Sequence, residues 1–305
     1  MLCGLQFLSR EGGGSNSKES DAVPMPMPND IQVVGPVGSA AENTANNNHV
    51  GWHQIDVFYG QRDDTFLTLP DHHNGWFSQV GQDQTVHWLL EEKRGGFFVD
   101  LAANDATMIS NSYSLEANHE WDGLCIEANS KYWARLAYRN CKVIGAVVGH
   151  QRMEAINFNF GPKTSSSVNY HHGGYENGML GGIVDNHMDN KVAKTNHELN
   201  NVVQRYTVPL QEIFERNHVP TTIDYFSLDV EGAESYIMSS FPFDQYRFRL
   251  LSIERPKADL QALLRSHNYT HVTQAAGKKV GKVSWDQIWA HESEMERIRA
   301  LPSTK

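Results

Sequence analysis

The chain has 305 residues, a formal net charge of -10 and a 40% share of hydrophobic residues. This length suits one large domain or two small ones, and the hydrophobic share can supply a sizeable core. The negative charge argues against nucleic acid as a partner, because a phosphate backbone requires a positive protein surface.

The cysteine pattern and the first residues indicate where the protein works. Cys3, Cys125 and Cys141 are too few for a disulfide framework and form no CxxC pair of the kind that binds zinc. We therefore expect reduced thiols, with Cys125 buried in a strand. The first eight residues lack the basic region of a signal peptide, and no later run approaches the ~20 apolar residues that cross a bilayer. These features predict a soluble, cytoplasmic protein with no membrane span.

Asn268-Tyr269-Thr270 fits the N-glycosylation sequon, but such triplets also occur by chance and carry little weight alone.

Composition divides the chain into two parts. Residues 1–50 are rich in Gly, Ser, Asn and Pro and cannot bury enough apolar surface to offset chain entropy, so we expect this segment to be disordered. Residues 51–305 form the expected single domain. Within it, residues 149–206 break the regular pattern, which predicts an inserted loop or lid near the substrate. The histidines of this stretch are spaced too irregularly to predict a metal site: His171, His172, His187 and His197.

The rest of the domain alternates short apolar runs with amphipathic segments. Apolar residues at helical spacing predict helices, whereas short β-favouring runs predict strands. The order strand, helix, strand, helix, strand implies parallel pairing with right-handed crossovers. The predicted helices span residues 82–94, 107–119, 130–138, 208–217 and 258–266. The predicted strands span residues 97–101, 123–127, 142–148, 158–160 (antiparallel), 223–228, 250–254, and 269–273 with 283–289 as a hairpin at the sheet edge.

Residues 97–106 form a strand that ends near Asp100 and continues into a turn of small residues. Such a turn lets the backbone approach a ligand and can donate N–H groups at the N-terminus of the next helix. Glu127 ends the following strand. An acid there, ~20 or more residues beyond the first turn, can accept hydrogen bonds from ribose hydroxyls. The alternative interpretation of Glu127 is a carboxylate stabilised by the dipole of the next helix.

A second group of acids follows the strand at residues 223–228. Asp229 and Glu231 lie two residues apart, so in extended geometry they project to the same side before Gly232 lets the chain turn. Paired acids in this position can hold a divalent ion, orient a cofactor amine or act as a general base. We expect Glu234, in contrast, to cap the next helix. Glu254 ends another strand and should reach the same edge of the sheet.

Three segments together resemble the FkbM-type, S-adenosylmethionine-dependent methyltransferase family, in particular its eukaryotic branch. They are residues 97–127 (FFVDLAANDATMISNSYSLEANHEWDGLCIE), 143–148 and 223–234 (IDYFSLDVEGAE). The LDVEGAE motif is the most specific of these, and it occurs together with VDxxAND. The resemblance extends over about residues 79–290. It implies an α/β, Rossmann-like class I methyltransferase fold, with a seven-stranded, mostly parallel sheet, helices on both faces and a reversed last strand.

The resemblance also implies a cofactor and roles for individual residues. S-adenosylmethionine is the expected cofactor, and no metal site is predicted, although the strand-end acids could hold a divalent ion. By analogy Asp229, with Glu231 as helper, faces the cofactor amine or the acceptor and serves as the general base. The residues expected at the cofactor, from its methionine part through the ribose to the adenine, are Asp100, Leu101, Ala102, Ala103, Asn104, Glu127, Asn129 and Ala146.

The turn after the first strand departs from the family pattern. The usual G-A-N-x-G is Ala102-Ala103-Asn104-Asp105-Ala106 here. If Ala102 has a positive φ, its Cβ strains the turn by on the order of 1 kcal/mol.

The expected reaction is transfer of a methyl group to a hydroxyl of a small-molecule or sugar acceptor. The alternative is a catalytically inactive methyltransferase-like module for binding or trafficking, which the alanines of the turn favour slightly. A third interpretation is an NAD-dependent oxidoreductase. Against it, the sequence lacks a GxGxxG motif and has no identifiable catalytic pair of Tyr and Lys.

Overall fold

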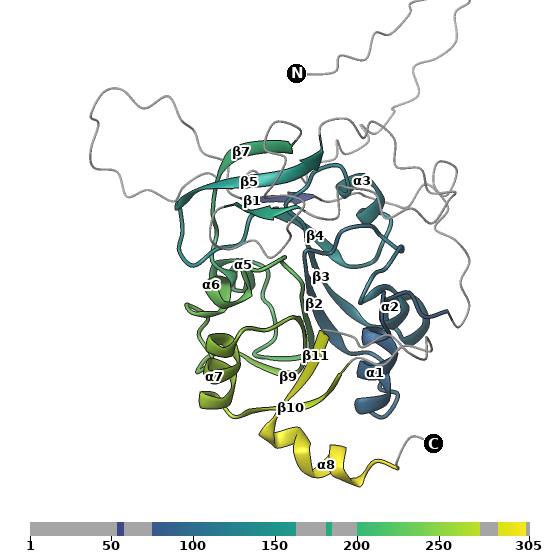
Figure 1. Ribbon diagram of the computed structural model, residues 1–305. Helices are drawn as coiled ribbons and strands as arrows, with labels where there is room; N and C mark the ends of the chain where they lie inside the picture. The colour runs from purple at the N-terminus through teal and green to yellow at the C-terminus, as the bar shows by residue number, and fades with distance from the viewer. Residues whose placement is uncertain (1–53, 58–74, 163–180, 185–199, 275–285, 303–305) are drawn as a thin grey trace, which may run out of the picture.

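The computed structural model describes residues 54–57, 75–162, 181–184, 200–274 and 286–302 (Figure 1). The segment predicted to be disordered, residues 1–50, and the four histidines of residues 149–206 lie outside the described residues. Among the helices that are described, none is long and apolar enough to cross a membrane.

A central sheet carries the fold. Its strand order is β1-β4-β3-β2-β8-β9-β11-β10, in which β2, β3, β4, β8 and β9 are parallel and β11 is antiparallel to both of its neighbours. The seven strands from β4 to β10 confirm the predicted Rossmann-like sheet with its reversed strand and closing hairpin. The additional β1 pairs antiparallel with β4 at the other edge. The strands are β1 (Gln54–Val57), β2 (Phe97–Leu101), β3 (Asp122–Ile126), β4 (Lys142–Ala146), β8 (Thr222–Leu228), β9 (Arg247–Glu254), β10 (Tyr269–Gln274) and β11 (Asp286–His291).

The register aligns the carboxyl ends of four parallel strands. Leu101 at the end of β2 pairs with Ile126 of β3 and with Leu228 of β8, and Leu228 in turn pairs with Ile253 of β9. The residues that follow this row therefore reach one edge of the sheet together. Because the chain order reverses between β2 and β8, this edge also contains the switch point where ligands bind in open α/β sheets.

Both faces of the sheet are covered by helices. Along β2, Phe98 belongs to one cluster of buried hydrophobic residues, while Val99 and Leu101 belong to another, so the two clusters lie on opposite faces. Figure 1 shows α1 and α2 on one side of the sheet and α5, α6 and α7 on the other. The helices are α1 (Gln82–Leu89), α2 (Tyr113–His119), α3 (Trp133–Leu136), α5 (Leu210–Arg216), α6 (Glu234–Met238), α7 (Ala258–Ser266) and α8 (Met295–Ala300).

Several helices are shorter than the sequence predicts, whereas α7 has the predicted bounds. The helix predicted from residue 107 begins only at Tyr113, because the Asp105 side chain accepts the N–H groups of Thr107 and Met108 and so forms a separate turn. The helix predicted over residues 82–94 ends at Leu89, and Glu91 and Glu92 then adopt positive φ.

A second sheet arises from the stretch that interrupts the regular pattern. It has the order β6-β5-β7, with antiparallel pairing, and its strands are β5 (Ala155–Pro162), β6 (Gly182–Ile183) and β7 (Asn200–Tyr206). The antiparallel strand predicted at residues 158–160 is confirmed as part of β5. Figure 1 shows this sheet beside the β1 and β4 edge of the central one.

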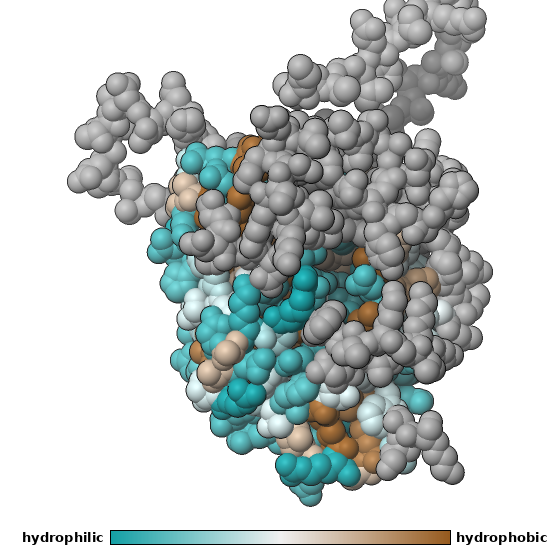
Figure 2. All heavy atoms as spheres, viewed as in Figure 1, coloured by the Kyte–Doolittle hydropathy of each residue, from teal (hydrophilic) through white to brown (hydrophobic). Residues whose placement is uncertain are grey.

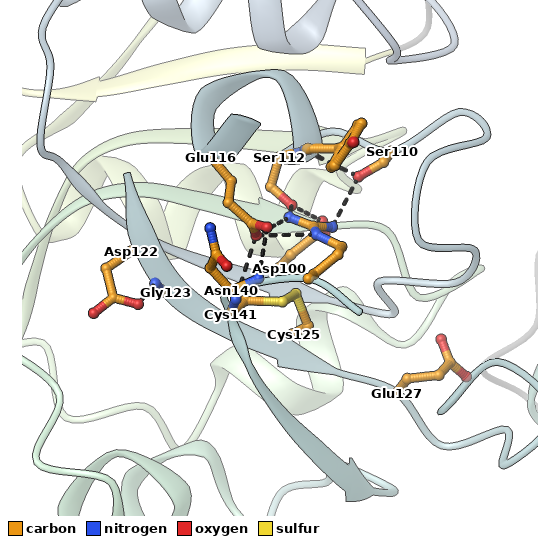
Figure 3. Close-up of a disulfide and its surroundings, with 12 residues drawn as sticks. Asp100, Ser110, Ser112, Glu116, Asp122, Gly123, Cys125, Glu127, Asn140 and Cys141 are labelled. Atoms are coloured by element: carbon orange, nitrogen blue, oxygen red, sulfur yellow. Dashed lines mark hydrogen bonds and ion pairs between the residues drawn. A yellow bond between two sulfur atoms is a disulfide. The ribbon is translucent and has the colours of Figure 1, made fainter. Parts of the chain in front are cut away.

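Cys125 and Cys141 form a disulfide, so the prediction of reduced thiols is wrong (Figure 3). Cys125 is fully buried in β3, as expected. Leu124 pairs with Lys142 in the parallel β3–β4 ladder, which brings the preceding Cys141 to a Cα distance of 5.9 Å from Cys125. The sequence conceals this proximity because the two cysteines are 16 residues apart and meet only when β3 and β4 become neighbours.

A buried ion pair adjoins the disulfide. The side chains of Arg139 and Glu116 are 0% and 3% exposed and lie 3.0 Å apart. Glu116 also accepts the backbone N–H of Cys141 (3.3 Å), while Arg139 donates to the hydroxyl of Ser112 (3.0 Å). Ser112 in turn donates to the carboxylate of Asp100 in β2. Figure 3 shows this network linking α2, the disulfide and the end of β2.

The turn after β2 has the backbone conformation that favours glycine. Ala102 has φ 65° and Asn104 has φ 58°. Ala102 thus meets the condition for strain, because its Cβ crowds the backbone in a left-handed conformation.

Hydrophilic residues cover most of the described surface on the face drawn in Figure 2, with smaller hydrophobic areas between them. The hydrophobic residues are concentrated inside, in the two clusters that flank the sheet.

We expect Glu116→Gln to lower the free energy of unfolding by about 3–5 kcal/mol, because it leaves the Arg139 charge buried without its counter-ion. Denaturant unfolding followed by circular dichroism measures this change. Glu120→Gln is the matched control, since it removes an exposed ion pair with Arg94 and should leave stability unchanged. Equal stability of Glu116→Gln and the unsubstituted chain would contradict a structural role for the pair.

We expect Ala102→Gly to raise the free energy of unfolding by about 0.5–1 kcal/mol, because glycine relieves the left-handed strain at a small entropic cost. Ala103→Gly provides the opposite control. Ala103 is buried and has no positive φ, so its loss of a packed methyl group should lower stability by about 1 kcal/mol. Thermal and denaturant unfolding of both variants test the two signs, and a destabilising Ala102→Gly would show that the turn is not strained.

Candidate functional site

A cavity of about 350 Å³ opens at the carboxyl ends of the parallel strands. Its walls come from the residues that follow β2, β3, β8 and β9, from the end of β4, and from β5 and β6 of the second sheet. A cavity of this size at the switch point suits a cofactor or small substrate. Eight of the ten predicted catalytic and cofactor residues line it, together with Glu254: Leu101, Ala102, Asn104, Glu127, Asn129, Ala146, Asp229 and Glu231.

Glu127 is held in the cavity by two backbone groups. One carboxylate oxygen accepts the N–H of Asn104 (2.8 Å), and the other accepts the N–H of Asn129 (2.6 Å). Burial raises the pKa of Glu127 to about 7, although both backbone hydrogen bonds oppose the shift. Glu127 therefore joins the turn after β2 to the loop after β3, and it presents a carboxylate that changes charge near neutral pH.

Asn104 contributes a buried polar atom at the cavity. Its side-chain amide oxygen is buried and has no hydrogen-bond partner among the described residues, although the residue lines the cavity. A buried acceptor of this kind is costly unless a ligand or water satisfies it. The amide oxygen of Asn104 thus marks a position where a donor group of a ligand fits.

Asp100 and Ala103 are the two predicted cofactor residues that are not among the described residues lining the cavity. Ala103 packs into the hydrophobic cluster with α1 and α2. Asp100 lies beneath the turn, only 2% exposed, and accepts a hydrogen bond from Ser112. Burial raises the pKa of Asp100, while Ser112 and Arg139 oppose that shift.

Three carboxylates gather on the other wall of the cavity. Asp229, Glu231 and Glu254 each place a carboxylate oxygen within 4.8 Å of the other two. Burial, followed by the charges of Glu254 and Glu231, raises the pKa of Asp229 well above its usual range. Carboxylate oxygens at this spacing suit proton transfer or a hard divalent cation.

The surroundings of these acids hold them in place. Arg255 lies 2.6 Å from Glu254 and 3.2 Å from Glu231, so one guanidinium offsets part of the negative charge. Glu234, which we expected to cap α6, instead accepts the N–H groups of Val230 (3.3 Å) and Gly232 (3.1 Å) and fixes the turn that carries Glu231.

An apolar wall closes the cavity opposite the acids. Ala146, expected beside the adenine, lies there at the end of β4. Residues 149–206 were expected near the substrate, and β5 and β6 of this stretch contribute to the wall. Sequence reasoning did not identify which of their side chains face the cavity, because no periodicity reveals it. It also missed Arg255, although a cation directly after the strand-end Glu254 is a signal that could have revealed it. The lining residues not predicted for the site include Gln79, Ile109, Tyr132, Phe158, Ile183 and Arg255.

Comparison with known proteins gives a family and a weak structural likeness. None of the curated proteins matches the chain. The crystal structure of a precorrin-6y C5,15-methyltransferase from Geobacter metallireducens is 12% identical, with 68% of this chain and 84% of that chain covered, and its TM-score of 0.29 is too low to support an argument.

The match to a protein family covers more than half of the chain. The model of the methyltransferase FkbM domain matches residues 100–288, from the end of β2 into β11. This range contains the turn at Ala102, Glu127 and the acids that follow β8 and β9. The chain belongs to the FkbM methyltransferase domain family.

Proposed function

We propose that the protein transfers the methyl group of S-adenosylmethionine to a hydroxyl oxygen of a small-molecule or sugar acceptor. The observation that carries this proposal is a single cavity lined both by Glu127 and Asn104 and by the strand-end acid Asp229. One wall has the groups to bind a nucleoside, and the other has a base.

The residues present fit S-adenosylmethionine. The Glu127 carboxylate can accept hydrogen bonds from ribose hydroxyls, and the free amide oxygen of Asn104 can accept one from the amine of the methionine part. Ala146 and the apolar wall suit the adenine. The bound cofactor supplies an electrophilic methyl group on a positively charged sulfur.

Asp229 is our proposed general base. Its carboxylate would take the hydroxyl proton of the acceptor when the acceptor oxygen gains the methyl group, while the carbon–sulfur bond of the bound cofactor would break and leave a neutral thioether. Burial and the neighbouring acids raise the pKa of Asp229, which makes its carboxylate a stronger base than an exposed aspartate. Glu231 acts as helper by sustaining this negative environment, and Arg255 fixes its position. Alignment and exclusion of water supply the rest of the rate enhancement.

The turn at Ala102 favours the second candidate, a binding module that holds the cofactor without turnover. Its left-handed alanine places a Cβ where the family pattern has glycine. Calorimetric titration with S-adenosylmethionine and incubation of cell extracts with methyl-labelled cofactor separate the candidates. Binding heat without labelled product would favour the module, whereas no heat with folded protein would reject both.

We expect Asp229→Asn to lower methyl transfer by ~10²–10⁴-fold while the cofactor still binds, because the amide cannot take the proton. Label transfer to extract components and calorimetry measure the two effects. Asp244→Asn, at an exposed position in the segment before β9, is the matched control and should keep full activity. Unchanged transfer by Asp229→Asn would remove Asp229 from the role of base.

We expect cofactor affinity to fall about tenfold from pH 8 to pH 6, because the pKa of Glu127 is about 7 and its protonated form is a poorer acceptor for ribose hydroxyls. Calorimetry across this range measures the profile. Glu127→Gln should bind weakly at pH 8 and lose the pH dependence. Glu234→Gln tests specificity, since Glu234 also has a pKa of about 7 but is not among the residues lining the cavity. A pH profile that survives Glu127→Gln would assign the titration to another group.

A further inference from the structure

The disulfide indicates the compartment in which the chain folds. Cys125 and Cys141 are 0% and 5% exposed, and the bridge joins β3 to the residue just before β4. Structural disulfides of this kind form in oxidising compartments and are rare in the cytosol, where thiols are kept reduced. The disulfide therefore favours an oxidising compartment, such as the lumen of the secretory pathway, over the cytoplasmic location that the sequence predicts.

Asn268 begins the sole N-x-S/T triplet in the sequence, Asn268-Tyr269-Thr270. The triplet lies where α7 gives way to β10, and the side chains of Asn268 and Thr270 are exposed. Tyr269 between them is 3% exposed, and its hydroxyl accepts the N–H of Phe248. Because side chains alternate along a strand, burial of Tyr269 turns the two sequon residues outward.

Asn268 lies two residues after the end of α7, and its backbone is held by hydrogen bonds. Asn268 has φ 64°, and its N–H donates to the carbonyl of Arg265 (3.2 Å). Its carbonyl accepts the N–H of Glu292 (2.8 Å), so the main chain is fixed on both sides. The position suits a modified asparagine because the backbone is anchored while the side chain is exposed to solvent.

The sequon lies at the edge of the central sheet away from the cavity. β10 runs antiparallel to β11, and β11 runs antiparallel to β9, so β10 is parallel to β9 and Asn268 precedes its amino end. The cavity lies at the carboxyl ends of the parallel strands. In Figure 1, α7 and β10 lie at the end of the molecule opposite β5, which contributes Phe158 to the cavity. A large group on Asn268 would not obstruct the site.

We propose that Asn268 is an N-glycosylation site and carries an N-linked oligosaccharide. The side-chain amide nitrogen forms a bond to the anomeric carbon of the first sugar and loses a proton. A lipid-pyrophosphate-linked oligosaccharide is the donor, and its lipid pyrophosphate is the leaving group. The outward-facing Thr270 supplies the hydroxyl that the sequon requires.

The position gives the oligosaccharide a physical role. β10 is the outermost described strand at its end of the central sheet, so among the residues that the structure describes one side of its backbone has no partner strand. Exposed strand edges can pair with other chains, and proteins protect them with charge, bulges or covering groups. An oligosaccharide on Asn268, one residue before β10, shields this edge from association between molecules.

The test is the mass of the peptide that contains Asn268 in the full chain, purified from its own cells with free thiols blocked. Enzymatic release of N-linked glycans in heavy-oxygen water should convert Asn268 to a labelled aspartate, and Cys125 should be recovered joined to Cys141. An unmodified Asn268 would overturn the proposal, whether or not the disulfide is intact.

Variants expressed through a eukaryotic secretory pathway separate the sequon from the fold. Asn268→Gln and Thr270→Ala should each lose the single glycan-dependent shift in gel mobility, whereas Thr270→Ser should keep it. Cofactor titration of all three variants should match that of the unsubstituted chain, because the site is remote from the cavity. A mobility shift that persists in Asn268→Gln would place the glycan elsewhere and reject the assignment.

Discussion

The parallel register of β2, β3, β8 and β9 is the constraint on which the site depends. Leu101, Ile126, Leu228 and Ile253 form one row of paired residues across the sheet. Glu127, Asp229 and Glu254 each occupy the next position in the chain, so their proximity follows from the ladder. A shift of one residue in any strand would turn its acid to the other face, because side chains alternate. The hydrophobic clusters on both faces prevent such a shift, since it would expose their buried residues.

The edge of the sheet that forms the cavity also contains strained backbone and closely spaced negative charges. Five non-glycine residues that line the cavity have positive φ: Ala102, Asn104, Ile109, Glu231 and Arg255. Three carboxylates also lie within 4.8 Å of one another there. Such strain and like-charge repulsion persist only where the surrounding structure enforces them, and they are typical of functional sites. Stability is supplied elsewhere, by the packed faces of the sheet, the disulfide and the buried Arg139–Glu116 pair.

The sequence predicts best those features that depend only on local residue patterns. The buried parallel strands are short apolar runs, and Glu127, Asp229 and Glu254 each directly follow such a run. Helix bounds are less predictable, because side chains such as Asp105 compete with the helix for backbone N–H groups. The disulfide and the apolar wall from the second sheet depend on which strands become neighbours. That information is absent from any single segment.

Asp100 illustrates how a motif residue can serve the site without lining it. Its carboxylate is buried beneath the turn and accepts a hydrogen bond from the hydroxyl of Ser112, the residue just before α2. Ser112 also receives a hydrogen bond from Arg139, whose partner Glu116 accepts the N–H of Cys141 at the disulfide. Asp100 is thereby linked through hydrogen bonds to α2, which follows the turn, and to Cys141 just before β4. We infer a positioning role for Asp100, because its buried, hydrogen-bonded carboxylate links β2, just before the left-handed turn of Ala102 and Asn104, to the start of α2.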